Sequence, residues 1–119
     1  MTVRRLKTHS AQTGYVYEYY FVGQRDALAD DPEAPAREFI FDVTSDRKQM
    51  VAVSVFLKPE AVEAWSRQHS RALGSAEQYA AAKMRLLKGF DEMDRIREHA
   101  RMTIGPSDIE ALLGDLGVD

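Results

Sequence analysis

The chain has 119 residues, a length typical of one domain, and 45% of them are hydrophobic, which is enough to build a substantial core. The net charge of −3 gives no positive field that would attract nucleic acid or acidic lipid, and the absence of cysteine excludes disulfides, thiolate zinc sites and cysteine nucleophiles. We therefore expect a single soluble domain over residues 1–119, located in the cytoplasm.

The first segment, residues 1–12, is predicted to be a flexible basic arm. Arg4, Arg5 and Lys7 place three positive charges in it, whereas the rest of the chain is acidic. No apolar segment follows these charges, so the arm is not predicted to be a signal peptide. Basic arms contact phosphates in some nucleic-acid-binding proteins, which makes these three residues the candidates for such contacts. The favoured alternative is a solvated chain terminus.

Three later segments are predicted to be strands, over residues 15–22, 37–44 and 49–57, because β-forming residues alternate in them with period two. The residues between the first two strands, 23–36, are acidic and contain two prolines, so they predict a long loop. The turn-forming residues 45–48 join the second and third strands into a hairpin.

The odd-numbered strand residues are predicted to form the core face. Successive strand residues point to opposite faces, and the odd set is apolar or aromatic in all three strands, including Tyr17, Tyr19, Phe41 and Val53. Phe41 and Val53 share one face only if the paired residue numbers of the hairpin sum to an even number. This requirement predicts three or five loop residues, or a bulge.

The even-numbered face mixes apolar and polar residues, whereas a solvated sheet face is usually more polar. Its apolar positions are candidates for the interface of a symmetric homodimer: Val16, Tyr20, Ile40, Ala52 and Phe56. The long helix described next is a second possible dimer surface. The alternative is a monomer in which the C-terminal helix folds over this face.

Two long helices follow the strands. Trp65 and His69 belong to an apolar stripe with spacings of three and four residues, which predicts a helix over residues 59–73. Ser75 begins a capping-box pattern, and the stripe that includes Phe90 predicts a second helix over residues 76–101. This order of strands and then helices is typical of an α+β protein with two helices packed on one face of a three-stranded antiparallel sheet.

A short C-terminal helix is predicted over residues 107–116, where Ser107 begins a second capping-box pattern. Its apolar stripe consists of Ile109, Leu112, Leu113 and Leu116. Such a stripe either docks into a groove on another protein or closes the core of its own chain.

A pocket between the sheet and the helices is a further hypothesis, with Tyr17, Tyr19, Trp65 and His69 as candidate ligand-binding residues. The favoured interpretation of His69 is a histidine at a packed face. No His-x-x-x-His or Glu-x-x-His spacing occurs, so we predict no metal site, and no nucleophile–base pattern indicates catalysis. We predict no cofactor.

We therefore interpret the chain as a non-enzymatic protein-interaction or regulatory module that acts as a homodimer. One alternative is a nucleic-acid-binding protein that uses the basic arm and the long helix, but acidic residues are interleaved with the basic residues of that helix and disfavour it. Another alternative is a small-molecule binder with the aromatic pocket. The longest apolar stretch, VAVSVFL, is far too short to span a membrane.

Overall fold

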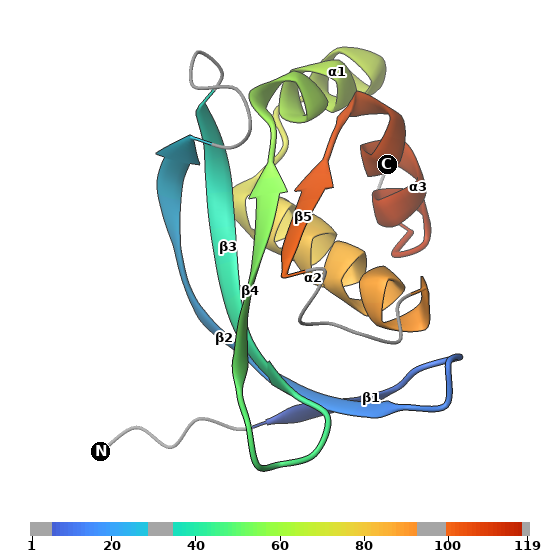
Figure 1. The fold of residues 1–119 in the computed structure, drawn as a ribbon. Coiled ribbons are helices and arrows are strands. Elements are labelled where there is room, and N and C mark those ends of the chain that lie inside the picture. Colours follow the sequence, from blue (N-terminus) through green and yellow to red (C-terminus); the bar gives the residue numbers. More distant parts are fainter. Residues whose placement is uncertain (1–5, 29–34, 93–99, 118–119) are drawn as a thin grey trace.

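A computed structural model gives the fold and describes residues 6–28, 35–92 and 100–117 (Figure 1). These residues form five strands and three helices, which confirms the α+β class. In chain order the elements are β1 (Lys7–Ser10), β2 (Val16–Leu28), β3 (Pro35–Thr44), β4 (Val51–Leu57), α1 (Pro59–His69), α2 (Ser75–Glu92), β5 (Arg101–Ile104) and α3 (Pro106–Gly114).

The sheet is larger than the sequence predicts. Its strand order is β1-β2-β3-β4-β5, and β5 pairs with β4 in parallel while the other neighbours are antiparallel. The predicted three-stranded antiparallel sheet is therefore only the centre of a mixed sheet. The first strand, Lys7–Ser10, lies within the predicted flexible arm and pairs with β2, so that Lys7 is opposite Tyr19. Its four polar or basic residues show no apolar alternation that would reveal a strand.

The predicted loop over residues 23–36 is wrong at both ends, because β2 continues to Leu28 and β3 begins at Pro35. A bulge between Phe21 and Gly23 shifts the register. Beyond the bulge the two strands pair through polar residues, for example Arg25 opposite Glu38. Polar side chains in this extension hide it from a search for alternating apolar residues.

The register confirms which sheet face is buried. Phe41 pairs with Val53 and Phe39 with Val55, so the paired numbers have an even sum as predicted, and all four side chains are fully buried. Residues 44–50 separate the last pair of the hairpin, which makes the connection longer than the predicted three or five residues. The even sum of the paired residue numbers, rather than the length of the loop, places these side chains on one face.

The sheet curls around α2, and α1 and α3 lie on the same side of it (Figure 1). Trp65 of α1, Phe90 of α2 and Leu113 of α3 are fully buried in one hydrophobic cluster with Phe41 of β3. The helices therefore cover the inner face of the sheet, as the sequence predicts for the two long ones. No helix within the described ranges has the length and apolar character needed to cross a membrane.

Two helix ends differ from the prediction. The first helix ends at His69 rather than at residue 73, because Ser70 adopts a left-handed conformation with a φ of 55°. The second helix was expected to continue to Arg101, but Arg101 instead begins β5, and residues 93–99 lie outside the described part of the chain. In β5 only Met102 and Ile104 are buried, which is too short an alternation to be recognised beside a helical stripe.

Glycines, not serines, occupy the N-cap positions of α2 and α3. The backbone N–H of Gly74 donates to Glu77 Oε1 at 3.0 Å, and that of Gly105 donates to Asp108 Oδ2 at 2.8 Å. The predicted cap at Ser75 is therefore displaced by one residue, to Gly74, and the predicted cap at Ser107 by two residues, to Gly105. In both helices an acidic side chain at the third helical position satisfies the N–H of the cap residue and complements the positive end of the helix.

Candidate functional site

The side of the sheet opposite the core, here called the outer face, carries accessible apolar side chains. Val16 is 50% exposed, Ala52 is also exposed, and Tyr20 and Ile40 are half-buried. In the part of the chain that the structure describes, no helix packs on this face, because α1, α2 and α3 bury their apolar sides against the inner face. The predicted interface residues therefore lie together on one open surface, with the exception of Phe56.

Phe56 lies on the outer face but is buried. The guanidinium group of Arg101, on the neighbouring strand β5, lies 4.6 Å from the centroid of the Phe56 ring. This cation–π contact covers the ring within the chain itself. The Phe56 ring is therefore not accessible to a partner, because Arg101 covers it.

The C-terminal helix does not cover the outer face. Ile109, Leu112 and Leu113 are buried in the inner core, and of the four predicted docking residues only Leu116, which is 45% exposed, remains accessible. The structure thus favours the alternative in which α3 closes the core of its own chain.

A buried carboxylate lies within the outer face. Glu38 is only 6% exposed, and it accepts hydrogen bonds from Arg25 Nε at 2.8 Å and from Ser54 Oγ at 2.5 Å. Burial raises the pKa of Glu38, but the two hydrogen bonds and the charges of Arg25 and Arg101 outweigh that effect and lower the pKa below its ordinary value of 4.5. Glu38 is therefore ionised at neutral pH.

The other two carboxylates of the outer face also have partners. Glu18 forms an ion pair with Arg47, and Asp42 accepts a hydrogen bond from the Tyr20 hydroxyl at 2.7 Å. On or beside this face there are thus three carboxylates and three guanidinium groups: Glu18, Glu38 and Asp42, and Arg25, Arg47 and Arg101. The accessible apolar side chains are therefore set among charges whose sum is zero.

The predicted ligand-binding tyrosines are core residues. Tyr17 stacks on Phe90 with ring centroids 4.3 Å apart, and Tyr19 lies 5.8 Å from the same ring. Burial and the neighbouring Tyr79 raise the pKa of Tyr19. These rings fill the space between the sheet and α2, so the aromatic stretch of β2 serves chiefly as part of the core.

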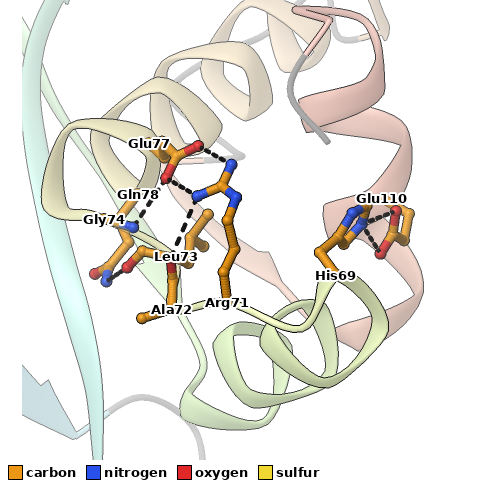
Figure 2. A network of polar contacts seen from close by, with 8 residues as sticks. All are labelled: His69, Arg71, Ala72, Leu73, Gly74, Glu77, Gln78 and Glu110. Atoms are coloured by element: carbon orange, nitrogen blue, oxygen red, sulfur yellow. Dashed lines mark hydrogen bonds and ion pairs between the residues drawn. The ribbon is translucent and has the colours of Figure 1, made fainter.

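Trp65 and His69, the other two predicted ligand-binding residues, stack on each other with ring centroids 4.2 Å apart. His69 Nε2 donates to the two carboxylate oxygens of Glu110 on α3, at 2.9 and 3.0 Å (Figure 2). Among the described residues, the buried indole N–H of Trp65 has no hydrogen-bond partner. His69 therefore connects α1 to α3, in agreement with the interpretation of a histidine at a packed face.

The four predicted pocket residues do not form one group. Among the ring contacts of the described residues, none joins the Trp65–His69 pair to Tyr17 or Tyr19. Tyr17, Tyr19 and Trp65 belong to one hydrophobic cluster, but the two tyrosines pack on Phe90 whereas Trp65 stacks on His69.

A second polar cluster connects the end of α1 to the start of α2. Arg71 donates to both oxygens of Glu77, at 2.9 and 2.8 Å, and Glu77 also accepts the N–H of Gly74 (Figure 2). The hydrogen bond from Arg71, followed by that from Gly74, lowers the pKa of Glu77 to about 2. The contribution of this carboxylate to stability is therefore present above its ordinary pKa of 4.5 and is lost as the pH falls towards 2.

We predict that Glu77 titrates at about 2 in an NMR titration of its side-chain carboxyl carbon. In the Arg71→Gln variant the same midpoint rises towards the ordinary value of 4.5, because the charged donor is lost. A midpoint near 4.5 in the native protein would show that the Arg71–Glu77 pair does not form.

The basic residues of the predicted arm have different environments. Arg4 and Arg5 lie outside the described residues, whereas Lys7 is part of β1. Lys7 lies close enough to Lys83 of α2 to affect the pKa of the Lys83 amino group. Burial, followed by the hydrogen bond and charge of Lys7, lowers the pKa of Lys83. Within the described ranges, neither lysine has a carboxylate partner.

A groove, here called the α2 groove, follows the accessible side of α2. One part is a cavity of about 330 Å³, lined by Tyr79, Ala80, Lys83, Met84, Leu87 and Leu116. The other part has a volume of about 290 Å³, shares Met84 and Leu87 with the first, and ends at His9 and Asp91. The shared residues make the two cavities continuous between β1 and α3.

A histidine–carboxylate pair marks the far end of the α2 groove. His9 Nε2 donates to Asp91 Oδ1 at 2.9 Å, and the N–H of Gln12 donates to the same oxygen at 3.2 Å. The hydrogen bond with His9 lowers the pKa of Asp91. A carboxylate orients the histidine in many general bases. In the described residues, however, no hydroxyl group is hydrogen-bonded to His9, so these two side chains form a dyad that joins β1 to α2.

Sequence reasoning missed the α2 groove. Lys7 and Lys83 are far apart in the chain and come together only because β1, which was not predicted, passes α2. One signal was available, since Met84 and Leu87 are apolar but lie off the buried stripe of the second helix. Apolar residues outside such a stripe indicate a second contact surface on the same helix.

Among the described residues, no group of three or more histidine, aspartate or glutamate side chains is arranged to hold a metal ion. Comparisons with protein-family models, with curated proteins and with solved structures found no match to this chain. Function is therefore inferred from its own residues and geometry.

Proposed function

We propose that this protein is a small interaction module that associates with a second copy of itself through the outer face of its sheet. The observation that carries the proposal is the set of accessible apolar side chains on that face, Val16, Ile40 and Ala52. Removing apolar surface from water stabilises an association by about 25 cal/mol per Å². Accessible apolar groups gathered on one face and surrounded by polar residues are typical of interaction sites.

The balance of charge on the outer face favours a second copy as the partner. In a symmetric dimer the same surface meets itself, so a face with an excess of one charge would repel its copy. Here the carboxylates of Glu18 and Glu38 are already paired with guanidinium groups, and that of Asp42 is bonded to Tyr20. Two such faces can therefore meet through their apolar residues without like-charge repulsion.

Sedimentation velocity at micromolar concentration tests the proposal. We expect the native chain to sediment as a dimer, at twice the 13.5 kDa mass of the monomer. In the Ala52→Arg variant a large cation occupies the middle of the face, and we expect a 13.5 kDa monomer. Asp42 lies opposite Ala52 in the sheet. Its carboxylate compensates the new positive charge within the monomer, so we expect the variant to fold.

The matched control is Gln68→Arg, which adds the same side chain at an exposed position of α1 away from the sheet. This variant should sediment like the native protein. A native chain that remains monomeric across the whole concentration range would overturn the proposal, as would a dimer that the Ala52→Arg substitution leaves intact.

A further inference from the structure

We propose that the α2 groove binds a small amphipathic anion. Its single anionic head group lies at the amino group of Lys83, with Lys7 of β1 near it, and its apolar part lies on Met84, Leu87 and Leu116. The groove belongs to α2, β1 and the C-terminal end of α3. The outer face of the sheet is not part of it, so this proposal does not depend on the proposed dimer.

The two lysines provide the binding site for the head group. Lys83 lines the groove, Lys7 lies close enough to affect its pKa, and neither lysine has a carboxylate partner among the described residues. Two adjacent ammonium groups repel each other, and an anion placed between them replaces that repulsion with two charge-assisted hydrogen bonds. The lowered pKa of Lys83, which results from burial and from Lys7, agrees with an unneutralised pair.

The rest of the groove selects an apolar body. Leu116 is 45% exposed, and Met84 and Leu87 pack against the core while lining both parts of the groove. From Lys83 to Asp91 the groove follows α2 for eight residue positions, which corresponds to about 12 Å at the rise of an α-helix. This length suits a medium-length alkyl chain.

The far end of the groove excludes a second anionic group. Asp91 and Asp115 both line it, against one cation, Lys88. The carboxylate of Asp91 is ionised at neutral pH because its hydrogen bond with His9 lowers its pKa. A ligand with anionic groups at both ends would meet these carboxylates, so the groove favours a molecule that is charged at one end only.

Isothermal titration calorimetry with three probes tests the proposal. Decanoate, used below its micelle concentration, has the head group and the chain; decanol has the chain alone; and acetate has the head group alone. We expect decanoate to bind and both partial probes to bind at least tenfold more weakly. The Lys83→Met variant keeps the aliphatic stem but loses the charge, and it should bind decanoate about tenfold more weakly or worse. The control Lys48→Met, at an exposed turn residue, should bind like the native protein.

An NMR titration of the native protein provides a second test that does not depend on whether the variants fold. On addition of decanoate, the pKa of Lys83 should rise towards the ordinary lysine value of 10.5, and the methyl signals of Leu116 and Met84 should shift. Equal binding of decanol and decanoate would overturn the proposal in favour of a purely apolar surface. Binding to phosphatidylglycerol vesicles without binding to decanoate would overturn it in favour of a membrane surface.

Discussion

Replacing Phe90 by alanine is expected to lower the free energy of unfolding by about 3–5 kcal/mol, the usual cost of removing a fully buried phenylalanine. Phe90 is fully buried on α2, and its ring contacts Tyr17 and Tyr19 of β2 and His9 of β1. The substitution therefore leaves a cavity where the helix meets the curled end of the sheet. Urea denaturation followed by circular dichroism measures the loss.

The matched control is Phe21→Ala. Phe21 also lies among aromatic rings, with its centroid 4.9 Å from that of Tyr79, but it is only half-buried and sits beside the bulge of β2. Its replacement should cost clearly less than that of Phe90, because part of its surface already contacts water. Equal losses in the two variants would show that Phe90 does not hold α2 against the sheet.

Replacing Glu38 by alanine is expected to lower the free energy of unfolding by about 1–3 kcal/mol, because the substitution leaves the half-buried hydroxyl of Ser54 without its acceptor. The loss is smaller than for a fully buried ion pair, since the Arg25 side chain is 68% exposed and turns to water. The control is Glu18→Ala. Its partner Arg47 is on the surface, so this pair is expected to contribute less than about 1 kcal/mol.

The effect of Glu38→Ala should depend on pH. The folded-state pKa of Glu38 lies below 4.5, because the hydrogen bonds from Arg25 and Ser54 outweigh the effect of burial. The carboxylate therefore stabilises the fold above 4.5, and this contribution is lost as the pH falls through the folded-state value. Denaturation of the native protein and the variant at several acidic pH values should show their difference shrinking. A difference that grows on acidification would contradict the ion-pair cluster.

The sequence predicts the centre of the sheet well because burial imposes a period of two on it. Phe39, Phe41, Val53 and Val55 recur at every second position of their strands, whereas the positions between them are mixed in polarity, and the structure buries all four. The outer strand β1 lacks this period of two in apolar residues. The four residues of Lys7–Ser10 are held by backbone pairing with β2 and by the bond of His9 to α2, neither of which leaves an apolar pattern in the sequence.

The candidate sites were less predictable, because they depend on contacts between distant segments. The predicted pocket residues are aromatic, but burial alone does not distinguish rings that line a cavity from rings that fill it. Tyr17 fills its space by stacking on Phe90. The charge balance of the outer face could not be predicted from the sequence either, because Arg25 reaches Glu38 only through the extension of β2 beyond the bulge. Arg101 joins them only through β5.

The central claim is that the sheet has one face for its own core and one face for a second copy of the chain. Methyl NMR with a soluble paramagnetic agent tests it residue by residue. In dilute solution the methyl signals of Val16 and Ala52 should broaden strongly, whereas that of the core residue Val53 should not. As the protein concentration rises, we expect Val16 and Ala52 to become protected. If both remain equally broadened at every concentration, the outer face does not bind a second copy.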